Sequence, residues 1–544
     1  MKRVRPRPSS NAIPQRLIGS ASYFAVNASL ITVLRGFGVA SGLVLDAVVA
    51  GFFGLGHQTD AYFAALAVPY LIASTVETQA AKVLVPFFAQ GFERNGREAT
   101  WSQLRNLIAT GGVLFSVLAG TLTVGAWLLL PAQVPGLDPE AMRRAIQLQM
   151  ILAWLVLIQS VSTFITGALY ADHHYITTNI SRLTTNSVAI IFVVLWHDRL
   201  GIYALGLGVT VGAGAQLACL VSAACWRGFT FGGVQFRDPG VMRVLRLCVY
   251  PVLGQTMSES RVFLENFLGS LLGAGSLSAV RYANRVVSAL AGILVGGVAT
   301  TALPMLSHYA ADERFEEMKN GLLTAIRWAA LLAVPLGLWL IFAGEPLIAV
   351  AFQRGRFTSS ESAQVGMLLA LLAPYVLASR VVDLAELAFY ASLDMRTPLW
   401  AIVVFLSAYV ILCFPLLPRF GVLAFAIATS GASILAAWFM VWLVQRRFGP
   451  FRWVSSRDFV RRLAIVGAVT TIGLWTAAAS ISAAVNMGLG ANVARLLSIT
   501  GAGLIAFLSS GCLLRLFNWR YIVQIVREAW RAKGAAPVPR NASE

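Results

Sequence analysis

The feature that most constrains this chain is a series of long apolar blocks that follow one another along most of its 544 residues. As a helix, a block of about 20 residues spans a hydrocarbon core about 30 Å thick. Only 12% of the residues are charged, which is far below the share of about 25% in a typical soluble domain. Because lipid offers no hydrogen-bond partners to an open backbone, the blocks predict an all-α membrane protein.

The blocks predict about fourteen transmembrane helices. Several contain Gly or Pro, which membrane helices tolerate where neighbouring helices satisfy the freed backbone groups. The predicted limits are 22–53, 61–89, 105–130, 142–170, 177–196, 203–226, 242–272, 278–307, 321–343, 363–392, 398–417, 421–445, 460–485 and 493–516.

The net charge of +18 is distributed unevenly between the two sides of these spans. The N-terminus, alternate connections and the C-terminal tail are rich in Arg. Connections of the opposite set that have neither Lys nor Arg are 54–60, 273–277 and 486–492. Since cationic loops remain in the cytoplasm, both termini are expected there. Arg354 and Arg356 depart from this pattern, because they fall in a predicted outer loop. The charges form no basic, aromatic-interleaved surface domain, which argues against a nucleic-acid partner.

Landmarks of the first half recur in the second half at a shared offset of about 218 to 220 residues. The pairs are Gly54-Leu55-Gly56 with Gly273-Ala274-Gly275, Val85-Pro86 with Leu303-Pro304, Ala168-Leu169-Tyr170-Ala171 with Ala388-Phe389-Tyr390-Ala391, and Ala204 with Ala424. An even number of spans separates each pair, so the two six-helix repeats run parallel. Parallel repeats are a transporter architecture, in which the substrate lies between two lobes that rock to alternate access.

The repeat divides the chain into two lobes, and two extra C-terminal helices lie outside the repeat. The predicted parts are a basic cytoplasmic N-terminus (1–21), an N-lobe of helices 1–6 (22–226), a C-lobe of helices 7–12 (227–445), helices 13 and 14 (446–516) and a cytoplasmic tail (517–544).

Ionisable residues lie inside the predicted spans, where a charge costs at least about 2.5–3.5 kcal/mol unless it meets a partner or a cavity. Arg281 and Arg285 are four residues apart, so they share a helical face, and they have no acid within a turn. Guanidinium groups match phosphate oxygens, which favours an anionic ligand. The cations assigned to a diphosphate or head group are Arg35, Lys82, Arg281 and Arg285. Arg182 in the fifth span is a further cation without an assigned role.

The acids admit two interpretations. Some can form a structural pair with a cation on their own helix, as Arg380 can with Asp383 and Arg261 with Glu265. The others can face a cavity or carry a coupling ion. The acids assigned to a cavity or gate are Asp46, Asp60 and Glu77, and those assigned to ion coupling are Glu259, Glu265, Asp383 and Glu386. Asp60 is also a candidate N-cap of the second helix.

Motifs over about residues 25–450 together resemble those of the MviN/MurJ lipid II flippase family. In the first half they are Gly54-Leu55-Gly56-His57-Gln58-Thr59-Asp60-Ala61-Tyr62-Phe63, Val68-Pro69, Glu77 and Val85-Pro86. In the second half they are Tyr282-Ala283-Asn284-Arg285, Leu303-Pro304, Phe352-Gln353-Arg354-Gly355-Arg356-Phe357-Thr358, and Tyr390 through Thr397-Pro398.

The resemblance implies a fourteen-helix fold of the multidrug/oligosaccharidyl-lipid/polysaccharide exporter superfamily in a bacterial inner membrane. It implies an undecaprenyl-diphosphate-linked peptidoglycan precursor, lipid II, carried from the cytoplasmic to the periplasmic leaflet for cell-wall synthesis. The partners would be membrane lipids and the cell-wall or polysaccharide synthesis machinery. The last two helices would form a groove for the lipid tail.

The chain departs from the family pattern in its N-terminal cations. Leu45 stands before Asp46, where the family typically has an arginine. Arg35 precedes Asp46 by eleven residues, about one helical turn further than is usual in the family. Ile72-Ala73-Ser74 replaces an arginine expected after Val68-Pro69.

Other classes of protein remain as alternatives. A flippase for another polyprenyl-linked glycan, such as an exopolysaccharide or O-antigen repeat unit, shares the same architecture. An ion-coupled drug exporter would have a more apolar pocket. A membrane enzyme usually needs a larger extramembrane loop, so no enzymatic activity is expected. The cysteines lack metal or redox spacing and no ATP-binding loop is present, so we expect no cofactor and no metal.

Overall fold

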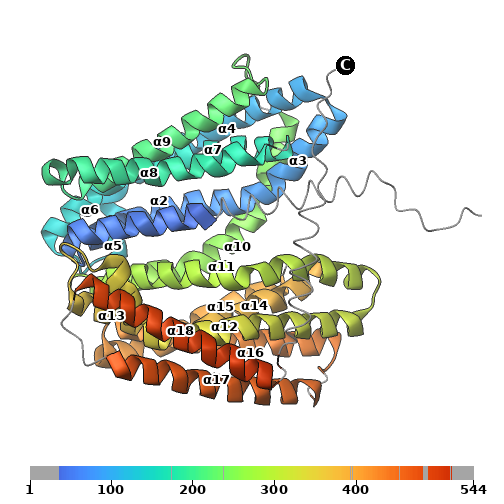
Figure 1. The fold of residues 1–544 in the computed structure, drawn as a ribbon. Helices are drawn as coiled ribbons and strands as arrows, with labels where there is room; N and C mark the ends of the chain where they lie inside the picture. The colour runs from blue at the N-terminus through green and yellow to red at the C-terminus, as the bar shows by residue number, and fades with distance from the viewer. Residues whose placement is uncertain are drawn as a thin grey trace, which may run out of the picture.

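The structure is a computed structural model. It describes residues 36–516 apart from 173, 237, 393, 395, 452–453, 482–487 and 515. Within this part of the chain every regular element is a helix (Figure 1). The predicted all-α fold is therefore confirmed.

The N-terminal half begins with a helix at Gly36–Phe53. It continues through α2 (His57–Thr75), the π-helix η1 (Val76–Ala80), α3 (Ala81–Arg94), α4 (Arg97–Val124), α5 (Ala126–Gln133), α6 (Pro139–Leu152), α7 (Leu155–Ala171), α8 (Tyr175–Leu200) and α9 (Tyr203–Trp226).

The C-terminal half begins with a long helix that passes between the two halves. Its elements are α10 (Pro239–Ser270), α11 (Ser276–Ala311), α12 (Phe315–Phe352), α13 (Ser359–Leu371), α14 (Ala373–Ala391), α15 (Thr397–Phe420) and α16 (Leu423–Phe448), followed by α17 (Val454–Ile481) and α18 (Leu489–Leu513). Helix starts follow local chemistry. Asp238, for example, caps α10 by accepting a hydrogen bond from Gly240 N at 2.7 Å, with Pro239 at the first helical position.

Eleven described helices are long and apolar enough to cross a membrane, or twelve if the bent pair α13–α14 counts as one span. The predicted number of fourteen is therefore not confirmed. The helices α10 and α11 are outside this count although they are 32 and 36 residues long.

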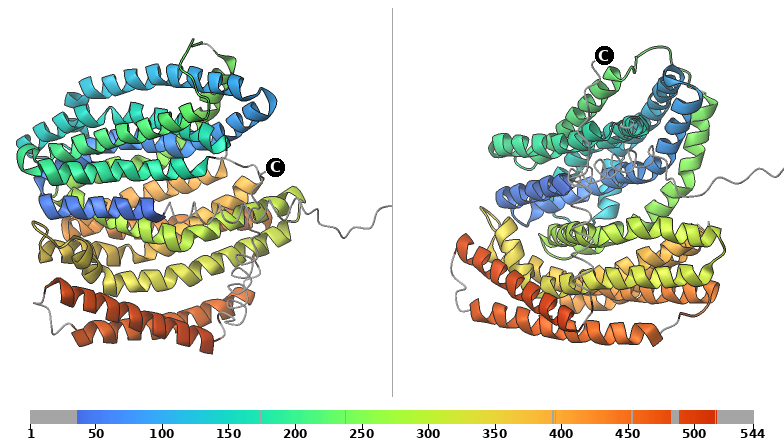
Figure 2. Two further views of the ribbon diagram at one scale, coloured as in Figure 1. Left: turned by 45° about the horizontal axis from the view of Figure 1, so that its top comes forward. Right: turned by 45° about the vertical axis from the view of Figure 1, so that its right-hand side comes forward.

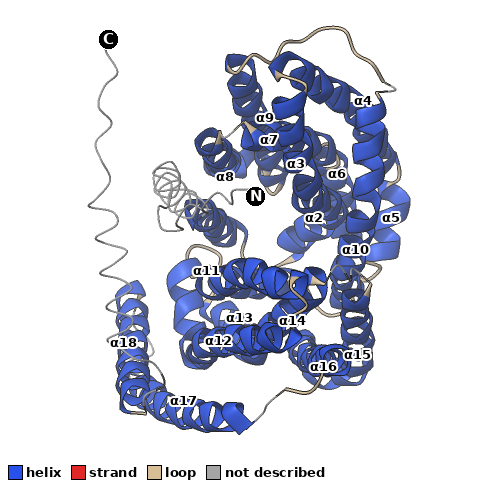
Figure 3. Cartoon of the chain, turned by 90° about the vertical axis from the view of Figure 1, so that its right-hand side faces the viewer, coloured by secondary structure: helices blue, strands red, loops and turns tan. Residues whose placement is uncertain are grey.

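The helices form two groups that correspond to the two halves of the sequence. In Figure 1 the N-terminal half lies above the C-terminal half, and α10 passes between them. Figure 3 looks along many of the helix axes and shows α10 at the junction of the two groups. The largest apolar core belongs mainly to the C-terminal half, and two smaller cores lie in the N-terminal half.

The last two helices pack on the outside of the C-terminal half, along the lower edge of the left view in Figure 2. Leu463 of α17 contacts the buried Ala330 and Leu331 of α12. The indole nitrogen of Trp339 on α12 donates to Thr500 Oγ1 of α18 at 3.0 Å. Arg495 Nη1 of α18 also lies 3.8 Å from Glu345 Oε2 of α12. This pair of helices is therefore attached to α12 by apolar packing together with polar contacts.

The two halves share backbone details at the spacing of the sequence repeat. Gly201 ends α8 with φ 54°, and Gly421 ends α15 with φ 52°. After each glycine the chain turns identically: Ala204 N donates to Gly201 O and Ala424 N donates to Gly421 O, both at 3.1 Å. Since a positive φ favours glycine, both turns depend on the residue that the repeat retains.

Candidate functional site

The first residues of α2 and α11 meet at one end of the molecule. Thr59 Oγ1 donates to Ser278 Oγ at 3.3 Å, and these two residues are 219 positions apart, which is the offset of the repeat. Two equivalent residues can touch only where the axis that relates the two halves passes between them. The contact therefore places the pseudo-two-fold axis at the N-termini of α2 and α11.

Asp60 joins the two lobes next to this axis. Its carboxylate accepts hydrogen bonds from Gly275 N at 2.6 Å, and from Ser278 N and Ser278 Oγ, both at 2.8 Å. The residue is 1% exposed. A carboxylate at a helix N-terminus satisfies open N–H groups and interacts favourably with the helix dipole. Asp60 thus binds α11 of the opposite lobe. The prediction that it caps its own helix is wrong, because Gly56 occupies the N-cap of α2.

A second connection between the lobes lies at the same end. Arg356 N donates to Gly51 O at 2.9 Å, and Leu55 N donates to Glu361 Oε1 at 3.0 Å. Gly355 has φ +58° and lies directly against the Gly51 carbonyl, so a Cβ at this position would clash. We call the inter-lobe contacts of residues 51–60, 275–278 and 355–361 the seam.

An ion pair crosses between the lobes away from the seam. Arg285 Nε of α11 lies 3.0 Å from Asp46 Oδ2 of the helix Gly36–Phe53. The Asp46 side chain is 16% exposed, whereas that of Arg285 is 47% exposed. A Cβ on Gly42 would lie 2.7 Å from Arg285 Nη2, so the glycine makes room for the guanidinium group. The outer edge of this guanidinium group is accessible to a ligand.

A second pair with an accessible cation lies within the N-terminal half. Arg182 Nη2 of α8 is 2.6 Å from Glu77 Oε1, with side chains 46% and 39% exposed. Glu77 lies in η1, a π-helical turn of the kind that often marks functional sites. Sequence reasoning assigned a role to Glu77 and none to Arg182. The available signal was a lone arginine in a span without any other charged residue.

Arg281 lies one helical turn before Arg285 on α11. Its Nη2 donates to Asn266 Oδ1 at 3.4 Å, and among the described residues it forms no ion pair with a carboxylate. Tyr70 of α2 lies within electrostatic range of both arginines and also of Glu77 and Glu259. Arg281 and Arg285 of the set assigned to a head group, and Glu77 of the set assigned to the cavity, therefore lie within electrostatic range of one side chain, Tyr70.

The acids assigned to ion coupling lie in different environments. Glu265 is buried and pairs with Arg261 at 2.9 Å. Tyr409 OH also donates to Glu265 at 3.4 Å. Glu259 accepts a hydrogen bond from Gln255 Nε2 at 3.2 Å.

The remaining assigned acids lie on α14. Arg380 Nη1 is 2.9 Å from Asp383 Oδ2. One turn further along, Glu386 accepts a hydrogen bond from Tyr390 OH at 3.5 Å. Asp383 therefore has a cation beside it, whereas the partner recorded for Glu386 is a neutral hydroxyl group.

Two of the predicted cations cannot be placed. Arg35 lies outside the described residues, and the structure describes only the backbone at Lys82. Among the described residues, no three His, Cys, Asp or Glu side chains are grouped in a way that would hold a metal ion.

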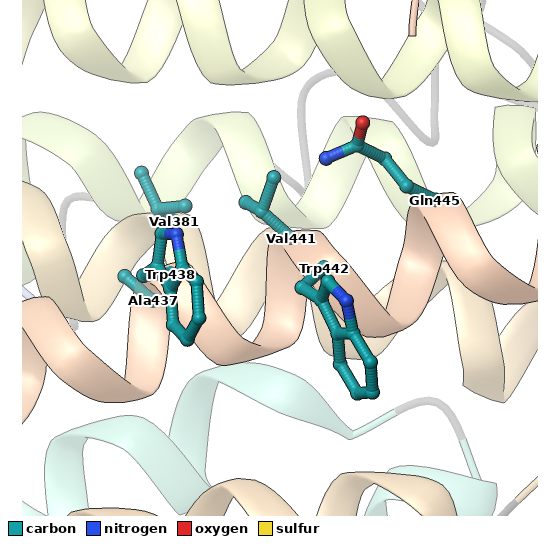
Figure 4. Close-up of a pocket in the computed structure, with 6 residues that line it drawn as sticks. All are labelled: Val381, Ala437, Trp438, Val441, Trp442 and Gln445. Atoms are coloured by element: carbon teal, nitrogen blue, oxygen red, sulfur yellow. The ribbon is translucent and has the colours of Figure 1, made fainter. Parts of the chain in front are cut away.

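A separate crevice lies between α14 and α16, and Figure 4 shows the side chains that line it. They are Val381, Ala437, Trp438, Val441, Trp442 and Gln445. The lining is mainly apolar and contains none of the charged residues assigned to the site. The crevice is therefore distinct from the charged groups within electrostatic range of Tyr70.

Comparison with known proteins assigns this arrangement to a family. The family model described as lipid II flippase MurJ matches residues 49–511. This chain belongs to the MurJ lipid II flippase family. The match extends from the first helix to α18, so it includes both lobes and the two C-terminal helices.

Curated members of the family are distant relatives over most of their length. A probable lipid II flippase MurJ from Synechocystis is 26% identical over 455 residues, covering 80% of this chain and 84% of the relative. The lipid II flippase MurJ of Burkholderia cenocepacia is 27% identical over 386 residues, covering 68% of this chain and 74% of the relative.

Solved structures show the same fold. A lipid II flippase MurJ in an inward closed conformation superposes with a TM-score of 0.73 at 18% identity, covering 89% of this chain and 99% of that chain. A MATE-family multidrug transporter in an inward-facing conformation gives a TM-score of 0.63 at 14% identity, covering 76% of this chain and 94% of the other. These similarities confirm the all-α membrane fold that the sequence motifs implied, but not the number of fourteen helices.

Proposed function

We propose that this chain flips lipid II from the cytoplasmic to the periplasmic leaflet of a bacterial inner membrane, for cell-wall synthesis. The observation that carries the proposal is the presence of a half-exposed, acid-paired arginine in each lobe. Arg182 of one lobe and Arg285 of the other each pair with an acid on one edge and leave the rest of the guanidinium group exposed. Family membership supplies the class of substrate.

These arginines are suited to a diphosphate. Guanidinium groups bind phosphate oxygens in a bidentate manner, and they keep their charge when water is excluded. Among the described residues the partner recorded for Arg281 is the amide of Asn266, so its guanidinium group would be able to bind a second phosphate oxygen. Arg182 would supply the N-lobe cation that is missing where Ile72-Ala73-Ser74 replaces the arginine of the family pattern.

The seam supports an alternating-access mechanism. With both termini in the cytoplasm, the loop before α2 and the loop before α11 lie on the periplasmic side. The seam would then close the periplasmic end of the cavity, and the head group would enter from the cytoplasm. Rocking of the lobes would break the contacts of Asp60 and expose the head group outside, as in other transporters built from two parallel repeats.

Two further parts of the proposal concern the lipid tail and the energy source. The groove of α17 and α18 beside α12 would hold the polyprenyl tail while the head group crosses.

Among the acids, Glu386 and Glu259 are the better candidates for coupling to an ion or to the membrane potential. Glu265 is a poorer candidate, because Arg261 already neutralises it.

Complementation tests the proposed function. We expect the wild-type chain to restore growth of a bacterium depleted of its own lipid II flippase, and Arg285→Ala to lose this activity at matched expression. Arg314→Ala is the matched control, because Arg314 is an exposed arginine that pairs with Glu317. Growth with the control and not with Arg285→Ala would support a cationic substrate site.

A flippase for another polyprenyl-linked glycan is the second candidate. It is favoured by the departures at Leu45 and at Ile72-Ala73-Ser74, which change the N-lobe cations. A well-expressed wild-type chain that fails to restore growth would overturn lipid II as the substrate. Stimulation of exopolysaccharide or O-antigen export by the same chain would then support the alternative.

A further inference from the structure

Tyr70 is an exposed aromatic side chain in the middle of a membrane helix. It lies 13 residues after His57, the first residue of α2, which corresponds to about 20 Å along the helix axis. A tyrosine at this depth is outside the interfacial belts, where tyrosine is usual in membrane proteins. It is nevertheless 53% exposed.

The environment of Tyr70 differs from that of the nearby tyrosines. Tyr62 and Tyr282 are 5% and 1% exposed, and both pack against Phe63. In the described part of the chain, Tyr70 has neither a ring contact nor a recorded hydrogen bond. Packing of the apolar core therefore does not explain its position.

The charged groups around Tyr70 come from both lobes. Arg285 and Arg281 of α11 and Glu259 of α10 lie within electrostatic range on the C-lobe side, and Glu77 of η1 does so on the N-lobe side. An exposed aromatic ring thus has two guanidinium groups and two carboxylates within electrostatic range, and Glu77 follows Tyr70 by seven residues, about two helical turns along the same face. Sites that bind small polar molecules commonly combine aromatic walls with a few converging polar groups.

This combination matches the chemistry of a sugar diphosphate. A pyranose ring has a face of C–H groups that stacks on the negative face of an aromatic ring, and a rim of hydroxyl and amide groups that hydrogen-bond to carboxylates. The diphosphate next to the first sugar requires cations. The ring, the acids and the arginines therefore correspond to the successive parts of one ligand.

We propose that Tyr70 forms a sugar subsite, in which its ring stacks on the pyranose attached to the diphosphate while Glu77 or Glu259 accepts hydrogen bonds from the sugar rim. The proposal rests on the proposed function and deepens it, because it assigns the glycan and the diphosphate to different side chains. It predicts that Tyr70 contributes to binding only when the lipid carries a sugar.

A binding experiment with two probes tests the subsite. The purified wild-type chain, Tyr70→Phe and Tyr70→Ala would be titrated with lipid II and with undecaprenyl diphosphate, which has the same diphosphate and tail but no sugar. Loss of an aromatic stacking contact should weaken lipid II binding about tenfold in Tyr70→Ala. Binding of undecaprenyl diphosphate should be unchanged, and Tyr70→Phe should bind both probes like the wild type.

The controls separate the possible failures. Melting temperatures of the variants check that each is folded, and Tyr203→Ala at the partly buried start of α9 provides a matched loss of a tyrosine elsewhere. Equal weakening for both probes would assign Tyr70 to the lipid or the diphosphate and overturn the sugar subsite. A loss in Tyr70→Phe as large as in Tyr70→Ala would assign the effect to the hydroxyl group and overturn stacking.

The same titration distinguishes this proposal from the function on which it rests. If the wild type binds lipid II and Tyr70→Ala binds it equally well, the flippase proposal stands and the sugar subsite is wrong. If the folded wild type binds neither probe, both proposals are wrong.

Discussion

Asp46 and Glu265 hold equivalent positions in the two halves of the chain, but they have different partners. They are 219 positions apart, the same separation as Thr59 and Ser278. Glu265 is buried and pairs with Arg261 of its own helix. Asp46 pairs across the lobes with Arg285, whose side chain is about half exposed.

The difference shows how a duplicated fold specialises. Backbone turns such as those at Gly201 and Gly421 are retained, because each half must fold in the same way. The charged side chains diverge, because only one of the two equivalent acids lies where the lobes meet. Contacts within a lobe persist when lobes move as rigid bodies, whereas contacts between lobes must form and break. We therefore assign the Glu265 pair to stability and the Asp46 pair to transport.

The largest expected effect is on the buried pair. Arg261→Ala would leave Glu265 without its cation, and removal of one partner of a buried ion pair costs about 3–5 kcal/mol. Arg261 Nη1 also donates to Thr429 Oγ1 at 3.2 Å, so the contact of α10 with α16 would weaken as well. Thermal unfolding of the purified protein in one detergent measures the loss.

A double variant provides the control for this effect. Arg261→Ala combined with Glu265→Leu removes both charges, so it should recover most of the stability lost in Arg261→Ala alone. Recovery would show that the unpaired carboxylate caused the loss. An unchanged melting temperature in Arg261→Ala would contradict the assignment of this pair to stability.

The seam gives the second-largest expected effect. Asp60→Ala removes an acceptor of three hydrogen bonds at the start of α11. The expected loss is about 1.5–3 kcal/mol, because water can reach the freed donors once the seam opens. We expect loss of complementation, together with faster labelling of Ser276→Cys by a membrane-impermeant maleimide in a background without other reactive cysteines. If Ser276→Cys is labelled equally slowly with and without Asp60→Ala, Asp60 does not hold the seam closed.

A mirrored variant sharpens the comparison of the halves. The repeat places Ala279 at the position equivalent to Asp60. Asp60→Ala combined with Ala279→Asp would move the carboxylate to the other side of the pseudo-two-fold axis, next to the N-terminus of α2. We expect labelling of Ser276→Cys to become partly slow again if the N-termini of α2 and α11 are equivalent. No recovery would show that the lobes differ at the seam in more than this one residue.

Much of the fold was predictable from sequence, because its signals are local or periodic. The length of the apolar blocks gave the helices, and the constant offset of motifs such as Gly54-Leu55-Gly56 gave the parallel repeat. The number of spans was not predicted as well, because Gly, Pro and charged residues interrupt the apolar signal in helices such as α10.

The partners of the site residues were harder to predict. Spacing along one helix correctly indicated which cations have an acid within a turn, as for Arg261 and Arg380. It could not indicate that Asp60 binds α11 or that Asp46 meets Arg285, because these contacts join residues more than 200 positions apart. Tyr70 gave no sequence signal, since an aromatic residue in an apolar span is usually part of the core.

An intermediate effect is expected for the pair between the lobes. Asp46→Asn keeps the shape of the side chain but removes its charge, so Arg285 would lose its inter-lobe partner. We expect transport in a proteoliposome assay to fall about tenfold, because charge pairs of this kind contribute about 1–2 kcal/mol in partly exposed sites. The melting temperature should fall less than in Arg261→Ala. A larger fall in stability than in transport would reverse the assignment of the two acids.

The smallest expected effect lies outside the spans, at the turn between α14 and α15. Asp394 N donates to Phe389 O at 2.9 Å, and His174 N donates to Leu169 O at 2.8 Å in the equivalent turn of the other half, so the backbone is shared. At the position equivalent to His174 the C-terminal half has the carboxylate of Asp394, whereas the carboxylate of the N-terminal turn belongs to Asp172, two residues earlier, and pairs with Arg97 and Arg227. Hydrogen bonds from Thr397, including one from its Oγ1 at 2.6 Å, hold the pKa of Asp394 below its ordinary value.

A lowered pKa means that the contribution of Asp394 to stability is complete above the ordinary carboxyl pKa and is lost as the pH falls through the folded value. We expect Asp394→Asn to cost about 0.5–1 kcal/mol at pH 7, with a smaller difference from the wild type below about pH 4. Thermal unfolding at both pH values measures this, and Thr397→Val should remove most of the effect of Asp394→Asn, since the two side chains act as one pair. A difference that stays constant with pH would show that the charge of Asp394 does not contribute to stability, and the turn between α14 and α15 would then differ from its counterpart only in side chains that do not titrate here.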